Sequence, residues 1–187
     1  MAGLFDAFPD LQSEEISIRK MTESDVNDLM EITENERVYR FIPPFLYRKS
    51  KGNLLAAIRN MGGRDFEKHK TVIPGIYWNS SRKLIGFFEV FDYRKRSGTV
   101  TIGYRLNESD WNRGIATKAC HMMTMYLSQM EDLKRLVAYV MPENVASAKV
   151  LLSSGFQKTP YTKEASGWGG RDSVTLDIYE YIIRHEN

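Results

Sequence analysis

The sequence of 187 residues contains a single cysteine, Cys120, and therefore cannot form an intrachain disulfide. We expect Cys120 to be a small buried residue rather than a nucleophile. The three histidines, His69, His121 and His185, show no metal-ligand spacing, and no metal site is predicted. No apolar run is long enough to span a membrane, and the start of the chain lacks the basic and apolar regions of a signal peptide. These absences favour a cytoplasmic protein with no membrane partner.

The chain also carries little net charge. The 26 Lys and Arg residues nearly balance the 24 Asp and Glu residues, which leaves a formal charge of +2. Such a balance gives no reason to expect direct nucleic-acid binding. The length suits one domain over residues 1–187, in which residues 1–13 are expected to be a loose lead-in. Composition alone leaves the oligomeric state open between a monomer and a homodimer.

Alternating apolar residues and turn formers predict strands over residues 14–20, 72–78, 84–93, 98–106, 134–141, 156–162 and 173–183. Helical spacing predicts helices over 22–32, 35–41, 50–70, 112–130 and 143–154, with Gly62-Gly63 interrupting the third and a flexible loop over 166–170. The short turns between residues 72 and 106 predict an antiparallel meander. The strand–helix–strand order that follows implies a crossover and a parallel pair. The expected class is α/β with a mixed, mostly antiparallel sheet.

The stretch from Thr99 to Met130 organises the rest of the chain, because a strand, a tight turn and a helix follow one another there. The first turn of a helix leaves N–H groups unpaired, and the helix dipole makes that end positive. The small residues Gly114 and Ala116 allow an anion to approach the backbone, and Arg113 adds a fixed charge. These residues predict a phosphate or diphosphate site.

Tyr104-Arg105-Leu106, followed by Trp111-Asn112-Arg113-Gly114-Ile115-Ala116-Thr117, resembles the acyl-CoA pyrophosphate loop of the GNAT N-acetyltransferase superfamily. The resemblance implies the GNAT fold, a twisted sheet flanked by helices, with acetyl-CoA as the cofactor and CoA as the product. Trp111 stands where many members carry Gln or Arg. Together with Ala116 it resembles the branch that acetylates ribosomal-protein N-termini, although Lys118 departs from the acidic residue usual there.

A second motif, from Asn144 to Ser147 with Gly155-Phe156 downstream, has two interpretations. The residues alone predict a helix with Asn144 as its N-cap and Gly155 as its C-cap. The motif also resembles the closing motif of the same acetyltransferase branch. That resemblance implies that Asn144 contacts the pantetheine arm or the acceptor and that Ser147 lies near the thioester sulfur.

Acetyl transfer to an amine needs a neutral amine, a donor to the developing oxyanion and a donor to the leaving thiolate. The resemblance places a general-acid tyrosine of many members where this chain has Leu151, so Ser147 is the candidate donor to sulfur. Glu89 is the best candidate base, with Asp92 and Glu108 behind it, although a strand carboxylate without a role is equally compatible. Phe41, Phe45 and Tyr47 either line the acceptor pocket or simply pack.

The resulting prediction is an acetyl-CoA-dependent N-acetyltransferase whose partner is an amine acceptor. The resemblance favours the α-amine of a ribosomal-protein N-terminus. Two alternatives stay open: an enzyme that acetylates a small amine, such as an antibiotic or a polyamine, and a non-catalytic acyl-CoA-binding module.

Overall fold

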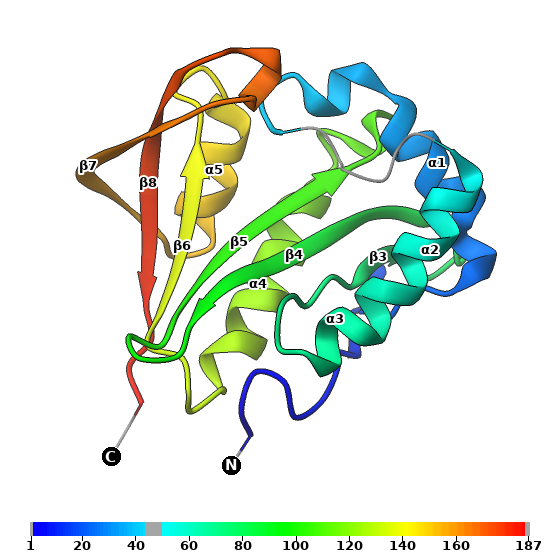
Figure 1. Ribbon diagram of the computed structural model, residues 1–187, viewed down its shortest axis with the longest axis horizontal. Coiled ribbons are helices and arrows are strands. Elements are labelled where there is room, and N and C mark those ends of the chain that lie inside the picture. Colours follow the sequence, from blue (N-terminus) through cyan, green and yellow to red (C-terminus); the bar gives the residue numbers. More distant parts are fainter. Residues whose placement is uncertain (1, 44–49, 186–187) are drawn as a thin grey trace.

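The computed structural model describes residues 2–43 and 50–185 (Figure 1). Within these residues, eight strands form one sheet in the order β1-β2-β3-β4-β5-β6-β8-β7. The strands are β1 (Leu11–Gln12), β2 (Ile16–Arg19), β3 (Gly75–Trp78), β4 (Leu84–Arg94), β5 (Thr99–Leu106), β6 (Arg135–Val140), β7 (Gln157–Ala165) and β8 (Val174–Ile182). Neighbouring strands are antiparallel except β5 and β6, which run parallel. The predicted fold class, the meander and the crossover are confirmed.

Helices cover both faces of this sheet: α1 (Val26–Glu34), α2 (Lys51–Gly62), α3 (Arg64–Glu67), α4 (Ile115–Ser128) and α5 (Val145–Ser153). Single 3-10 turns lie at Glu23–Asp25, Glu36–Tyr39, Glu108–Asp110 and Trp168–Gly170. In Figure 1, α2 and α3 lie in front of the sheet and α4 lies behind β4 and β5. None of the described helices is long and apolar enough to cross a membrane.

Helix α4 packs on the sheet through apolar residues that repeat every four positions. Ile115, Ala119, Met123 and Leu127 are all at most 2% exposed and pack into one core with residues of β4, β5 and β6. Cys120 lies in the same core and is fully buried, and burial raises the pKa of its thiol to about 11. A buried, protonated thiol is a poor nucleophile, and the prediction of a small buried residue is confirmed.

The alternation of side chains along β4 decides which groups face which layer. Phe88 belongs to the core under α4, whereas Phe87 belongs to a second core formed with α1 and α2. Because successive side chains of a strand point to opposite faces, Glu89 lies on the α2 face with Phe87. Glu89 lines a cavity on that face.

Strands β5 and β6 are paired only at their beginnings, where Thr99, Val100 and Thr101 stand opposite Arg135, Leu136 and Val137. Beyond this point the two strands diverge, as Figure 1 shows. On its other side β5 stays paired with β4 as far as Leu106. A glycine is needed there, because a Cβ on Gly86 would lie 2.2 Å from the carbonyl oxygen of Arg105. The second half of β5 therefore borders an opening toward β6.

The expectation of a loose lead-in over residues 1–13 is wrong for the described residues. Leu4 is 1% exposed, and its N–H donates to the carboxylate of Asp132 at 2.9 Å. The ring of Phe5 stacks on His69 with 4.6 Å between centroids, and β1 adds an edge strand to β2. Nothing in the sequence pattern indicates this packing, because isolated apolar residues show no periodicity.

Candidate active site

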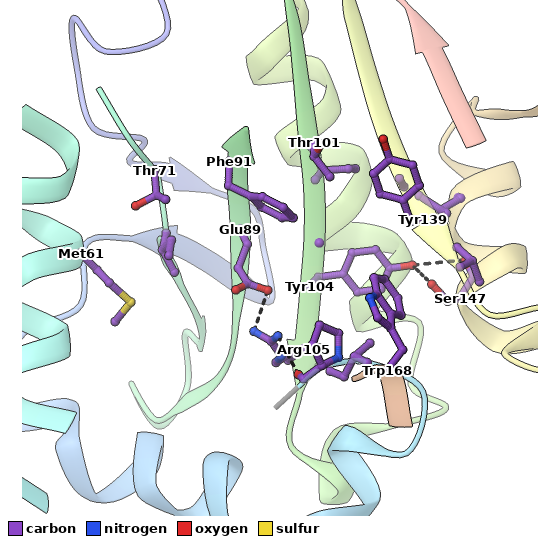
Figure 2. A pocket seen from close by; sticks show the side chains of 18 of the residues that line it. Met61, Thr71, Glu89, Phe91, Thr101, Tyr104, Arg105, Tyr139, Ser147 and Trp168 are labelled. Atoms are coloured by element: carbon purple, nitrogen blue, oxygen red, sulfur yellow. Dashed lines mark hydrogen bonds and ion pairs between the residues drawn. The ribbon is translucent and has the colours of Figure 1, made fainter. Parts of the chain in front are cut away.

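Two cavities of about 460 and 430 Å³ lie on either side of the opening beside β5. Ile42, Tyr104, Arg105 and Ser147 line both, so the cavities meet at these residues. The first cavity extends over the face that carries Glu89, and Figure 2 shows the side chains that surround it. The second extends to the first residues of α4. The arrangement offers two ligands a common meeting point.

The start of α4 presents open N–H groups to the second cavity. Lys118 makes the first intrahelical bond, to the Gly114 carbonyl at 3.0 Å. In the described parts of the chain, the N–H groups of Ile115, Ala116 and Thr117 donate to no protein atom, and no side chain caps the helix. Gly114 has a φ of 75°, a left-handed conformation that glycine adopts without strain. Such a helix start is a site for an anion.

The cations that line the second cavity do not include Arg113, which the sequence suggested. Arg113 does not line the cavity, and its side chain is 59% exposed, 3.9 Å from Asp110. Arg37, Arg40 and Lys149 line the cavity instead. Arg37 is engaged by Glu108 at 2.6 Å. No sequence motif marks these three residues, because only the fold brings them to the start of α4.

The remaining loop residues lie where the motif predicts a ligand-binding wall. Leu106, Trp111, Asn112 and Thr117 line the second cavity. The indole N–H of Trp111 donates to the Leu106 carbonyl at 3.0 Å, which fixes the loop against the end of β5. Of the aromatic residues considered for the acceptor pocket, Phe41 lines this second cavity, whereas Phe45 and Tyr47 lie outside the described residues.

Asn144 and Ser147 sit at the start of α5, as the second motif predicts. The Asn144 side chain accepts from the Ser147 N–H at 3.2 Å, so its predicted role as N-cap is confirmed. The Ser147 hydroxyl lies 2.9 Å from the Tyr104 hydroxyl, which also approaches the Ser147 carbonyl at 3.2 Å (Figure 2). Burial raises the pKa of Tyr104, so its hydroxyl keeps its proton and can donate. The sequence pattern does not indicate this partner of Ser147, because Tyr104 is 43 residues away along the chain.

Glu89 forms an ion pair with Arg105 on the floor of the first cavity, 2.6 Å between Oε2 and the guanidinium (Figure 2). The Arg105 side chain is 6% exposed and the Glu89 side chain 17%. The Arg105 guanidinium also lies over the Phe87 ring and donates to the Pro43 carbonyl at 3.3 Å. Arg105 thus belongs to both cavities, rather than to the cofactor wall alone.

Asp92 and Glu108, the alternative candidates for a base, do not line the first cavity. Asp92 is exposed and bonds to Arg94 at 2.8 Å, and Glu108 is held by Arg37 and Asn35.

Leu151 does line the first cavity and is fully buried. Trp168 lines it too, from a segment expected to be a flexible loop, which forms a 3-10 turn instead. The Gly169 N–H of that turn donates to the Ile42 carbonyl at 3.3 Å.

A family model described as acetyltransferase (GNAT) domain matches residues 15–157. The chain belongs to the GNAT acetyltransferase family. Among curated relatives, an uncharacterized N-acetyltransferase p20 of Bacillus licheniformis is 26% identical over 177 residues, which cover 92% of this chain and 94% of the relative. The recognition made from the two motifs and the prediction of an acyltransferase are confirmed.

Solved structures of this family share the fold but differ in the acceptors that their names give. A ribosomal L7/L12 alpha-N-protein acetyltransferase in complex with coenzyme A has a TM-score of 0.82 at 19% identity, with 94% of this chain and 98% of that chain covered. A spermidine N-acetyltransferase from Vibrio cholerae in complex with CoA and spermine has a TM-score of 0.75 at 13% identity, with 91% and 97% covered. The GNAT fold therefore does not by itself select an acceptor.

Proposed function

We propose that this GNAT protein transfers an acetyl group from acetyl-CoA to the α-amine of a protein N-terminus, with ribosomal proteins as the first candidates. The observation that carries the proposal is the meeting of two cavities at Tyr104 and Ser147. One cavity extends to the open N–H groups at the start of α4, and the other extends past Glu89.

The second cavity suits acetyl-CoA. The N–H groups of Ile115, Ala116 and Thr117 would bind the diphosphate, and the exposed Lys149 would add a counter-charge. The edge of β5 that has lost β6 as a neighbour would bind the amide-rich pantetheine arm, as a sheet edge binds an added strand. Acetyl-CoA, when bound, supplies an acetyl thioester at the junction of the two cavities.

At the junction, Ser147 is the donor that we assign to the departing sulfur. When Tyr104 donates to the Ser147 Oγ, the Ser147 proton is available to a group in the cavity. Both hydroxyls are neutral, so their effect is a hydrogen bond and not a full proton transfer. A backbone N–H at the edge of β5 would donate to the carbonyl oxygen as negative charge develops there.

The proton that the amine must lose passes to Glu89 in this proposal. Glu89 Oε2 is bound by Arg105, whereas Oε1 makes no hydrogen bond within the described residues. An α-amine with a pKa near ~7.7–8.0 is neutral in roughly a tenth of molecules at pH 7, whereas a lysine near ~10.4 is neutral in about one in 2,500. An α-amine therefore depends less on a protein base than a lysine does, which favours the α-amine as the acceptor.

The test is turnover with matched acceptors. The protein is incubated with acetyl-CoA and peptides that begin with alanine, serine or threonine, and thiol release is followed. The same peptides with a blocked N-terminus are the control. The proposal predicts release with the open peptides and none with the blocked ones. Turnover limited to polyamines or aminoglycosides would overturn the assigned acceptor, and no turnover with any amine would overturn the catalytic proposal.

A further inference from the structure

The end of the first cavity away from Ser147 contains two polar groups, of Thr71 and Asp65, that make few polar contacts within the described residues. Thr71 Oγ1 is buried and makes no hydrogen bond in the described part of the chain. The Asp65 side chain is only 16% exposed, and its one ion-pair contact within the described residues is 3.8 Å from Nε of Arg64, a side chain that is itself 59% exposed. Both residues line the cavity. A buried hydroxyl without a partner is unfavourable, and a carboxylate that is only 16% exposed is incompletely solvated, so both groups favour a ligand group in the cavity.

These two groups adjoin each other and lie across the sheet from Ser147. The Thr71 N–H donates to the Asp65 carbonyl at 3.4 Å. The bridge between Val72 and Val90 places Thr71 beside Phe91, and Phe91 stands opposite Thr101 on β5. Figure 2 shows Thr71, Phe91 and Thr101 in that order, with Ser147 beyond them. Two strand spacings of about 4.8 Å put Thr71 roughly 10 Å from β5.

The charges of the cavity leave Asp65 as the group to be neutralised. Glu89 and Arg105 form an ion pair at 2.6 Å and offset each other. Among the charged residues that line the cavity, only Asp65 then remains, so the cavity holds one net negative charge. Between the two ends the wall is largely apolar, with Met61, Ile73 and Phe91. An apolar channel with a carboxylate at its far end suits a carbon chain that ends in a cation.

We propose that Asp65 and Thr71 form a subsite for a second cationic group of the acceptor. The acceptor is then a primary amine with another positive charge at least about 10 Å from the nitrogen that is acetylated, because Ser147 lies beyond β5. A lysine or arginine at the second position of an N-terminal peptide meets this requirement, because one extended residue spans at most about 3.6 Å and its long side chain covers the rest. This inference rests on the proposed function and specifies its acceptor.

The test compares two pairs of acceptors that differ only in the second charge. One pair is a peptide that begins with alanine and carries lysine or norleucine next. The other pair is diaminooctane and octylamine. We expect kcat/KM to be at least tenfold higher for the charged member of whichever pair is used, and Asp65→Asn to remove most of that preference. Thr71→Val should reduce the preference for the charged acceptor about threefold. Glu67→Gln, an exposed carboxylate on the same helix, is the matched control and should change nothing.

Direct binding gives a second readout that needs no turnover. In calorimetry with CoA present, diaminooctane should bind at least tenfold more tightly than octylamine to the wild type and equally to Asp65→Asn. Equal affinities in the wild type, or a preference that survives Asp65→Asn, would overturn the subsite. Acetylation of both peptides at the same rate would overturn it while the proposed function stands. Acetylation of diaminooctane but of no peptide would support the subsite and overturn the proposed function.

Discussion

The Tyr104 hydroxyl lies 2.9 Å from the Ser147 hydroxyl, at the point where the two cavities meet. If Ser147 donates to the departing sulfur, Ser147→Ala should lower kcat about tenfold with little change in KM for acetyl-CoA, because the hydrogen bond forms mainly as charge develops. Tyr104→Phe should lower kcat about threefold through Ser147. Steady-state kinetics of the two single variants and the double variant measures both effects.

The double variant separates a shared role from two independent ones. If Tyr104 acts through Ser147, the loss in the double variant should match the Ser147→Ala loss rather than the product of the two. Ser153→Ala, an exposed serine on the same helix, is the control and should behave as the wild type. Losses that multiply would mean that Tyr104 acts on its own.

Glu89→Gln should affect stability and activity together. The substitution leaves the buried Arg105 charge without its carboxylate, and we expect the free energy of unfolding to fall by about 3 kcal/mol in urea titrations. The rate with an α-amine acceptor should fall about tenfold at pH 7 and less at pH 9, where the amine is already neutral. Asp92→Asn, an exposed residue of the same strand, should change neither. A defect that is equal at both pH values would exclude Glu89 as the proton acceptor.

The pH dependence of stability should report on Tyr93. Burial, assisted by its 2.9 Å bond to Asp132, raises the pKa of Tyr93 to about 12 from an ordinary 10.0. The folded state therefore holds this proton more tightly, so the contribution to stability is complete below pH 10 and is lost as the pH rises toward 12. Tyr93→Phe should flatten the fall in unfolding free energy between pH 10 and pH 12. Tyr77, whose pKa burial also raises, leaves a residual slope. An unchanged slope would contradict this assignment.

Local patterns were enough to predict the framework of the site. The three meander strands and the start of α4 follow from alternation, turn residues and a four-residue apolar repeat, all encoded in short stretches. The N-cap role of Asn144 is equally local, since the bond spans three residues. The fold and the open N–H groups at the start of α4 are therefore predictable from short segments of the chain.

The side chains that specify the site depend on contacts between distant segments. Asp65 comes next to Thr71 only through the turn after α3, and both reach the cavity only because residue 72 bridges β4. Arg105 was expected on the cofactor wall, but the register of β4 and β5 brings it to Glu89. Strand register and side-chain direction are tertiary properties, and a single sequence does not reveal them.

Binding of CoA to variants of Gly114 tests the central claim most directly, namely that the first turn of α4 binds the diphosphate. A Cβ at Gly114 would meet no atom within 4 Å, so a side chain there fits at the cost of a left-handed backbone, about 1 kcal/mol. Gly114→Gln and Gly114→Glu share this strain and bulk, and only the latter adds negative charge. By calorimetry, Gly114→Glu should bind CoA at least tenfold more weakly than Gly114→Gln. Equal affinities of the two variants and the wild type would contradict the account.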